Sequence, residues 1–564
     1  MIRLLILLTS GFAYSQASLI DYSHPFHPTY TDSGIVVSQN YLSSDVGVEI
    51  LNKGGNAVDA AIAVGFSLTA TLPRAGNIGG GGFMQVYIAK DKTILTIDFR
   101  SMAPELATRE FYQDAKAEND DVTRKGYKAI AVPGTVAGLF KAHELYGSLP
   151  MKDLIQPTID LLEKGIPITQ DLYLAINTGR YIKNDPESNN IYKKNLSLGG
   201  KLKNDDLIRT LKIIQIEGRE GFYNGPIADL INDQMVKNGG LIRKSDLASY
   251  KVNLYAPIRT DYRGKKIFAM GAPSGGGVVI LTALNILECF QLSKLAPNSA
   301  QTYHLLAEAM KFAHHNRSKY VGDPSFSEIP YDMLLSKKLA CEKAKQIKLK
   351  EAFTPKRTAR TGDSINNSYI ESKDTTHFSI MDKEGNAVSV TYTLGYSFGS
   401  GVTIPGTGIL TNNQMNNFAH SYGIRDSYFR SSSPANKLDP LKRPMSTMSP
   451  VMVFDSKGNL ELITGSPGGS QIPGIILQVL INSIEFNLDI GAASMMPRIH
   501  QDSQSLSMEY EKFLSEDTLR ILRSYGHKLE VSDTMGSSQS IEVKDGIRYG
   551  FADLRRPDAK VSIQ

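Results

Sequence analysis

The stretch Asp374-Thr-Thr-His-Phe-Ser-Ile-Met-Asp-Lys-Glu-Gly-Asn-Ala-Val-Ser-Val-Thr-Tyr-Thr393 decides the fold. Two alternating runs flank the turn formers at residues 382–386, and this pattern predicts a β-hairpin with a five-residue loop. Centring the hairpin on Glu384 sets apolar residues opposite apolar ones and polar opposite polar, whereas a one-residue slip would mix them. The predicted apolar pairs are Phe378–Val390 and Ile380–Val388, and the predicted polar pairs are Ser379–Ser389, His377–Thr391 and Thr375–Thr393.

A second predicted hairpin lies further along the chain. It joins residues 451–454 to residues 460–464 and runs directly into Gly465-Ser-Pro-Gly-Gly469. Strands are also expected at 34–38, 83–89 and 94–99, and helices at 45–52, 57–68 and 300–319. Residues 150–350 are mostly helical in pattern, and the polar stretch 343–372 is expected to be a loop or linker. Successive hairpins together with long helices predict an α+β fold in which helices cover antiparallel sheets.

The composition is that of an ordinary globular protein. Of 564 residues, 41% are hydrophobic and 21% charged, and a net charge of +5 is too small for this length to suggest a nucleic-acid partner. At about 150 residues per domain the length corresponds to three or four domains, or to one large two-layer core. The two cysteines, Cys289 and Cys341, exclude a disulfide scaffold. One bridge and two buried thiols both remain open.

The N-terminus has the features of a signal peptide. Arg3 precedes the apolar run Leu4-Leu-Ile-Leu-Leu8, and Ser15-Gln-Ala17 offers small residues for cleavage after Ala17. A membrane-spanning helix needs about 20 apolar residues, more than this stretch provides. We therefore expect residues 1–17 to be removed and the remaining chain to be periplasmic or secreted, with no membrane span.

Glycine-rich loops are the most informative candidates for chemistry. Residues 76–82 and 465–469 match neither G-x-G-x-x-G nor a phosphate-binding loop, so no nucleotide cofactor is expected. The backbone N–H groups of such loops suit an oxyanion or a carboxylate. Neither H-E-x-x-H nor a Cys/His ligand spacing occurs, and no catalytic metal is expected. Residues 271–277, Gly-Ala-Pro-Ser-Gly-Gly-Gly, form either a closely packed turn or part of a site.

Seven motifs follow one another along the chain: Gly54-Gly-Asn-Ala-Val-Asp-Ala-Ala61, Gly76-Asn-Ile-Gly-Gly-Gly-Gly-Phe83, Asp98-Phe-Arg-Ser-Met-Ala-Pro104, Val132-Pro-Gly-Thr-Val-Ala-Gly138, Asp374-Thr-Thr-His-Phe378, Lys442-Arg-Pro-Met-Ser-Thr-Met-Ser-Pro450 and Gly465-Ser-Pro-Gly-Gly-Ser470. In number and order they resemble the motifs of the gamma-glutamyltransferases, a family of N-terminal-nucleophile hydrolases. The resemblance extends from about residue 34 to the C-terminus.

The resemblance implies a precursor that cleaves itself between Asp374 and Thr375, giving a large subunit (18–374) and a small subunit (375–564). It also implies a four-layer αββα sandwich built from both subunits, which form a heterodimer. Thr375 would be the nucleophile, and Thr393 would support its hydroxyl. A hydroxyl needs a base to accept its proton. The α-amine that cleavage frees on Thr375 is such a base, because α-amines titrate at about 7.7–8.0 in model peptides.

The resemblance also implies a binding site for a small molecule, a γ-glutamyl compound such as glutathione. An arginine fork suits a planar carboxylate, and glycine N–H groups suit an oxyanion. The matching positions are Arg100, Ser446 and Thr447 for the α-carboxylate, Gln414 for the α-amino group, Tyr428 in a lid loop over the substrate, and Gly468 and Gly469 for the oxyanion hole.

Two positions depart from the family pattern. The family usually has Asp where this chain has Asn417, and that carboxylate pairs with the substrate's α-ammonium group. The family commonly has Asn where this chain has Gly395. Hydrogen bonds to charged groups contribute about 1.5–3 kcal/mol, so losing the charge at 417 weakens α-amino recognition while the nucleophile and oxyanion hole remain.

Three functions are compatible with these residues. The first is an exported γ-glutamyltransferase that forms a γ-glutamyl ester on Thr375 and passes it to water or an amino acid. The second is an acylase, or a capsule-type enzyme acting on poly-γ-glutamate, on the same scaffold; its donor has an acylated α-amine and needs no carboxylate at 417. The third is an unprocessed, inactive binding protein, which the intact Thr375, Thr393, Gly468 and Gly469 disfavour.

Overall fold

The computed structural model describes residues 25–119, 121–353, 374–419, 434–503, 505 and 507–564. The central hairpin consists of β10 (Thr376–Met381) and β11 (Ala387–Thr393). Phe378 lies opposite Val390 and Ser379 opposite Ser389, which confirms the predicted register. At the end nearer Thr375 the ladder stops at Thr376–Tyr392, one pair short of the predicted pairing of Thr375 with Thr393.

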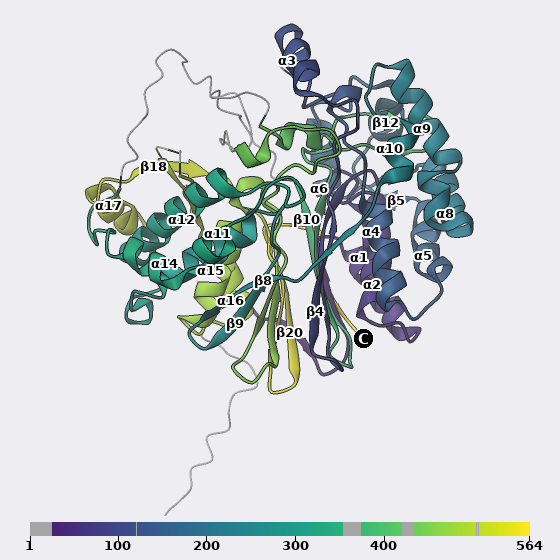
Figure 1. Cartoon of the computed structure of the whole chain (residues 1–564). Helices are drawn as coiled ribbons and strands as arrows, with labels where there is room; N and C mark the ends of the chain where they lie inside the picture. The colour runs from purple at the N-terminus through teal and green to yellow at the C-terminus, as the bar shows by residue number, and fades with distance from the viewer. Residues whose placement is uncertain (1–24, 120, 354–373, 420–433, 504, 506) are drawn as a thin grey trace, which may run out of the picture.

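Two antiparallel sheets of seven strands lie face to face (Figure 1). The first contains β10 and β11 together with β2 (Ile35–Ser38), β3 (Gly81–Ile88), β4 (Thr93–Phe99), β7 (Asn253–Tyr255) and β21 (Lys560–Ile563). The second contains β1 (Thr29–Thr31), β8 (Ile258–Tyr262), β9 (Lys265–Ala269), β14 (Val451–Phe454), β15 (Leu460–Thr464), β19 (Gln539–Lys544) and β20 (Ile547–Ala552). Their strand orders are β21-β2-β10-β11-β3-β4-β7 and β1-β20-β19-β15-β14-β9-β8. The α+β class and both predicted hairpins are confirmed.

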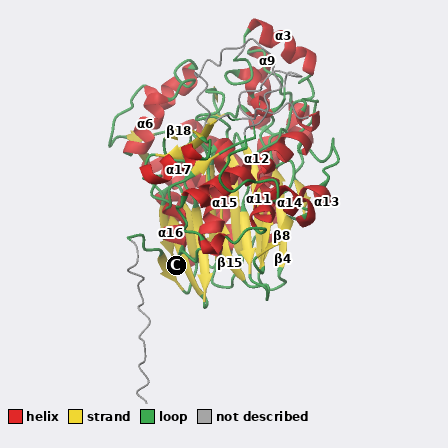
Figure 2. Cartoon of the chain, turned by 90° about the vertical axis from the view of Figure 1, so that its left-hand side faces the viewer, coloured by secondary structure: helices red, strands yellow, loops and turns green. Residues whose placement is uncertain are grey.

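Helices cover the outer face of each sheet (Figure 1). Outside the first sheet lie α1 (Tyr41–Asn52), α2 (Ala57–Thr71), α4 (Thr135–Tyr146), α5 (Met151–Lys164) and α8 (Asp205–Tyr223). Outside the second lie α11 (Gly276–Leu287), α12 (Ala300–Tyr320), α14 (Lys337–Ala344), α15 (Ile472–Ile484), α16 (Ile490–Met495) and α17 (Glu516–Ser524). Figure 2 shows α11, α12, α14 and α15 in front of the strands. The predicted helices at 45–52, 57–68 and 300–319 are confirmed, and each extends slightly further.

The two faces of β10 have different neighbours. Phe378 and Ile380 join the hydrophobic core that includes α2. On the opposite face Met381 belongs to a small apolar cluster between the sheets, and Ser379 donates a hydrogen bond to the Gln539 carbonyl of β19 at 2.9 Å. His377 lies next to Ser379 on this face and nearer to Thr375, so the space between the sheets becomes more polar towards Thr375.

One disulfide links α14 to the segment that follows α11. The structure bridges Cys289, just beyond α11, to Cys341 in α14, and thereby settles the alternative that the sequence leaves open. The loop expected at 343–372 begins slightly later, because α14 continues to Ala344. Among the described residues, no helix is both long and apolar enough to cross a membrane.

Candidate active site

The peptide bond between Asp374 and Thr375 lies at the edge of the central hairpin. Thr375 is 3% exposed. The hydroxyl of Thr393 donates a hydrogen bond to the Asp374 carbonyl oxygen at 3.0 Å and accepts one from the N–H of Gly395 at 2.9 Å. A donated hydrogen bond draws electron density towards the carbonyl oxygen, so Thr393 polarises the carbonyl of this peptide bond.

Two arginines hold the side chain of Asp374. Its Oδ1 lies 3.8 Å from Nε of Arg74 and 3.8 Å from Nη2 of Arg556. Burial alone would raise the pKa of Asp374, but the two arginines and a hydrogen bond with Ser397 outweigh burial and lower it. The carboxylate is therefore ionised at neutral pH. Asp171 shares both arginines, with Nη2 of Arg74 at 2.7 Å.

A short 3₁₀ helix, η4 (Gln414–Asn417), connects this edge to Arg100. Gln414 Nε2 donates to the Thr393 carbonyl oxygen at 2.7 Å. At the other end of η4, Asn417 Oδ1 accepts a hydrogen bond from Arg100 Nη2 at 2.5 Å. The structure thus brings together Arg100 and Asn417, to which the family resemblance assigns the α-carboxylate and the α-amino group of one substrate.

The loop after β4 fixes Arg100, which is 1% exposed. Its Nε donates to the Pro444 carbonyl at 3.2 Å, and its own N–H donates to Asp98 at 2.8 Å. Asp98 is paired in turn with Arg443 at 2.5 Å. The guanidinium of Arg100 is therefore held in place next to the segment that carries Ser446 and Thr447.

Thr447 and Ser446 connect this segment to two glycine loops. Thr447 Oγ1 donates to the Gly469 carbonyl at 2.7 Å. Gly468 and Gly469 have φ values of +135° and +58°, a left-handed region that favours glycine, just before α15. On the other side the N–H of Gly275 donates to the Ser446 carbonyl at 2.7 Å.

Close packing explains the glycines in segment 271–277. A Cβ on Gly276 would lie 2.3 Å from the Thr447 carbonyl oxygen, and one on Gly277 would lie 2.1 Å from the Met270 carbonyl oxygen. This segment therefore supports the site from behind through tight backbone contacts. The first glycine loop is similar, because a Cβ on Gly80 would lie 2.3 Å from the carbonyl oxygen of Thr393.

His377 lies between the sheets near this edge. Burial lowers its pKa to about 3. Nδ1 contacts the Thr391 hydroxyl at 2.8 Å and Nε2 contacts the Ser379 hydroxyl at 3.1 Å. A Cβ on Gly465 would lie 2.2 Å from the ring. The imidazole is neutral and closely packed, which makes it part of the framework behind Thr375.

Several residues around the site carry no signal in the sequence. Arg74 and Arg556 lie 482 positions apart (556 − 74), and only the fold brings both to Asp374. Asn436 donates to the Asn417 carbonyl at 2.8 Å and accepts from Met445 N–H at 2.8 Å. Tyr428, predicted to cover the substrate, lies outside the described residues.

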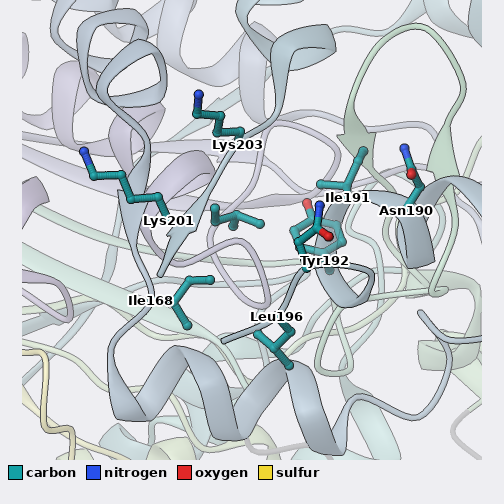
Figure 3. Close-up of a pocket in the computed structure, with 9 residues that line it drawn as sticks. Ile168, Asn190, Ile191, Tyr192, Leu196, Lys201 and Lys203 are labelled. Carbon is teal, nitrogen blue, oxygen red and sulfur yellow. The ribbon is translucent and has the colours of Figure 1, made fainter. Parts of the chain in front are cut away.

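A small pocket lies elsewhere on the molecule (Figure 3). It has a volume of about 150 Å³ and is lined by residues of η2 (Asn189–Lys193) and β6 (Lys201–Leu202) and their neighbours. Figure 3 shows the amino groups of Lys201 and Lys203 pointing away from Ile168 and Leu196. No described candidate site residue lines this pocket.

Three known proteins resemble this chain over nearly its whole length. The fold matches the crystal structure of a cephalosporin acylase from Bacillus halodurans with a TM-score of 0.83 and 28% identity, over 97% of this chain and 99% of that one. A glutathione hydrolase proenzyme of Escherichia coli (strain K12) is 41% identical over 94% of this chain and 92% of its own length. An acylase ACY 1 proenzyme of Pseudomonas sp. (strain SE83) is 34% identical over 96% of both.

The sequence profile of the gamma-glutamyltranspeptidase family matches residues 43–563. The chain therefore belongs to this family of enzymes. The resemblance inferred from the seven motifs is confirmed.

Proposed function

We propose that this protein is a self-cleaving γ-glutamyl hydrolase and transpeptidase whose nucleophile is Thr375. The observation that carries the proposal is the hydrogen bond from the Thr393 hydroxyl to the Asp374 carbonyl at 3.0 Å. In the cleavage step Thr375 Oγ attacks this carbonyl carbon, the peptide C–N bond breaks and an ester forms. The hydroxyl proton passes to the departing nitrogen, which becomes the free α-amine of Thr375, and water then hydrolyses the ester to restore the hydroxyl and leave an α-carboxylate on Asp374.

The proposed products are a large subunit of residues 18–374 and a small subunit of residues 375–564. The topology supports a stable heterodimer after cleavage. In the first sheet β10, β11 and β21 come from the small subunit and pair with β2 and β3 of the large one. In the second, β14 pairs with β9. Both subunits would thus contribute strands to both sheets of a four-layer αββα sandwich, so neither can leave without breaking both sheets.

In turnover the freed α-amine of Thr375 takes the proton from its own hydroxyl, which attacks the γ-amide carbonyl of the donor. The N–H groups of Gly468 and Gly469 bind the oxyanion that forms. The leaving amine departs with a proton, and a γ-glutamyl ester remains on Thr375. Water or the amine of an amino acid then attacks this ester, and Thr393 holds the hydroxyl in both steps.

The proposed donor is a γ-glutamyl amide such as glutathione. Arg100, Ser446 and Thr447 bind its α-carboxylate, and Gln414 and Asn417 its α-amino group, with Tyr428 above it. Burial of Arg100 supports this role, since a desolvated guanidinium attracts a carboxylate more strongly than one in water. The E. coli relative named a glutathione hydrolase supports this donor.

An acylase or poly-γ-glutamate enzyme is the second candidate. The observation that favours it is the neutral Asn417, whose amide oxygen already accepts from Arg100. No carboxylate at this position is available for an α-ammonium group. The relative named an acylase also points to this alternative.

Export to the periplasm or the medium is part of the proposal, with residues 1–17 as the signal peptide. The mature protein would then meet its γ-glutamyl substrates outside the cytoplasm. Fractionating cells that produce the full chain and determining the N-terminal residue of the large subunit tests this part. A large subunit that retains residues 1–17 in the cytoplasmic fraction contradicts it.

Replacing Thr375 by Ala tests the proposed nucleophile. We expect one unprocessed chain and no turnover, because the substitution removes the attacking hydroxyl. Thr376→Val is the matched control: the buried Thr376 hydroxyl has no hydrogen-bond partner among the described residues, so its loss should leave cleavage intact. Denaturing gels give the result. Two subunits in Thr375→Ala refute the proposed nucleophile.

A further inference from the structure

Two buried histidines and a buried glutamate meet beside α12. His304 and Glu308 lie one turn apart on this helix, and His527 follows α17. One ligand atom from each, a ring nitrogen or a carboxylate oxygen, lies within 4.8 Å of the other two. The exposed fractions are 0%, 1% and 6%, respectively. None of the three belongs to the candidate active site, and their separation in the sequence hides them from any search by motif spacing.

Hydrogen bonding directs two ring nitrogens towards each other. His304 Nε2 lies 2.7 Å from the Lys348 carbonyl oxygen, which only accepts, so Nε2 carries the proton and Nδ1 the lone pair of a neutral ring. This Nδ1 lies 2.8 Å from Nε2 of His527. Facing imidazole nitrogens share either one proton or one cation. In a metal-bound histidine, the ring nitrogen that does not bind the metal usually donates to a carbonyl or a carboxylate, as Nε2 of His304 does here.

We propose that His304, Glu308 and His527 form a binding site for a divalent transition-metal ion, with Zn²⁺ as the best fit. Two imidazoles and one carboxylate are a donor set that Zn²⁺ takes, with water as the fourth ligand. Tetrahedral Zn–N bonds of about 2.0–2.1 Å place the two nitrogens about 3.3 Å apart, so the ring pair opens by about half an ångström.

Lys311 limits the affinity of this site. Its Nζ lies 2.7 Å from Glu308 Oε1, and the Phe353 N–H donates to the same oxygen at 3.2 Å. An ion therefore shares Glu308 with an ammonium group of like charge. Without Lys311 the buried carboxylate is left without its counter-charge until an ion binds, which favours the ion.

The ion has a structural consequence in a cleaved chain. His304 and Glu308 precede position 375 and His527 follows it, so one ion would join the two subunits. The site itself does not rest on the proposed function, because the uncleaved chain contains all three ligands. Both wild type and Thr375→Ala should therefore bind the ion, whatever their processing.

Titration of untagged, metal-free, full-length protein with Zn²⁺ against a chromogenic chelator tests the site. We expect one tight site per chain, and about tenfold or greater weakening by His304→Gln or His527→Gln. The control is His315→Gln, an exposed histidine on the same helix, which should change nothing. No stoichiometric binding in wild type, or equal affinity in His527→Gln, overturns the proposal.

Lys311→Met gives a test in the opposite direction. We expect Zn²⁺ to bind about threefold or more tightly in this variant, because the competing charge is gone. A histidine pair that only shares a proton predicts no such gain. Circular dichroism checks that each variant folds. If the histidine variants do not fold, Lys311→Met decides: tighter binding supports the site, and unchanged or weaker binding refutes it.

Discussion

The two ends of the candidate site are built in different ways. At the end that holds the proposed nucleophile, the register of one hairpin brings the Thr393 hydroxyl to the peptide bond between Asp374 and Thr375, one position beyond the paired residues. At the end proposed to bind the donor's α-amino group, Asn417 of η4 accepts a hydrogen bond from Arg100, which lies 317 positions away. Strand pairing positions the Thr393 contact at the first end, whereas the contact at the second end needs distant parts of the fold. We infer that the chemistry is fixed by the hairpin, whereas donor preference changes through η4 and its partners.

Removing the Thr393 hydroxyl should break the nucleophile end. In Thr393→Val the Asp374 carbonyl loses its donor with little change in shape, and we expect self-cleavage to slow by about 10²–10³-fold, as on loss of one oxyanion donor. A gel time course of the purified precursor measures the rate. Thr376→Val, which removes a buried hydroxyl with no hydrogen-bond partner among the described residues, is the control and should be processed normally. Equal rates in the two variants would mean that Thr393 plays no part in cleavage.

Changing Arg100 should damage only the other end. Lysine cannot hold a planar carboxylate with two parallel N–H groups, so Arg100→Lys should raise the KM for a γ-glutamyl donor by about tenfold. Self-cleavage involves no free α-carboxylate and should continue. Steady-state kinetics on the processed enzyme and gels of the same preparation separate the two effects. If cleavage and turnover fall together, Arg100 is structural.

The smallest expected effect is at Asn417. If the donor has a free α-amine, Asn417→Asp should raise its kcat/KM by a factor that corresponds to about 1 kcal/mol once the desolvation of the new charge is subtracted. Pairing of the new carboxylate with Arg100 removes part of this gain. A donor with an acylated α-amine should become worse. If the enzyme is an acylase, wild type prefers the acylated donor and the substitution inverts the preference.

Specificity constants for glutathione and for an N-acylated glutamyl amide, in both proteins, distinguish these outcomes. Unchanged values for both donors would show that position 417 does not contact the donor. The surrounding structure sharpens this test, because the Asn417 carbonyl is fixed by Asn436 at 2.8 Å. A change of side chain at 417 should therefore alter charge more than position.

The sequence predicts the hairpin end well and the remainder less completely. Alternation alone determines the pairing of Phe378 with Val390, because a slip would place polar residues in the core. The exact contact of Thr393 differs from the expectation: its hydroxyl reaches the Asp374 carbonyl, since Thr375 is still joined to Asp374 by a peptide bond. Strand-pairing rules do not apply to Thr375, which lies one position beyond the last paired residue of the hairpin.

Long-range contacts could not be predicted from the sequence. Arg74 and Arg556 approach Asp374 only through the packing of the whole chain. The motif resemblance identifies Arg100 and Asn417 as site residues, but their mutual hydrogen bond appears only in three dimensions. Gly395 is similar: its φ is +105°, and a Cβ at this position would lie 2.2 Å from Asn413 Oδ1, so a larger residue there requires Asn413 to move.

The central claim is that the chain cuts itself before Thr375 and then uses that residue's α-amine. Intact mass and N-terminal sequencing of the purified wild-type protein test it most directly. We predict two chains, the smaller beginning at Thr375 and ending at Gln564. A single full-length chain with γ-glutamyl hydrolase activity, or a small chain that begins at any other residue, would contradict the claim.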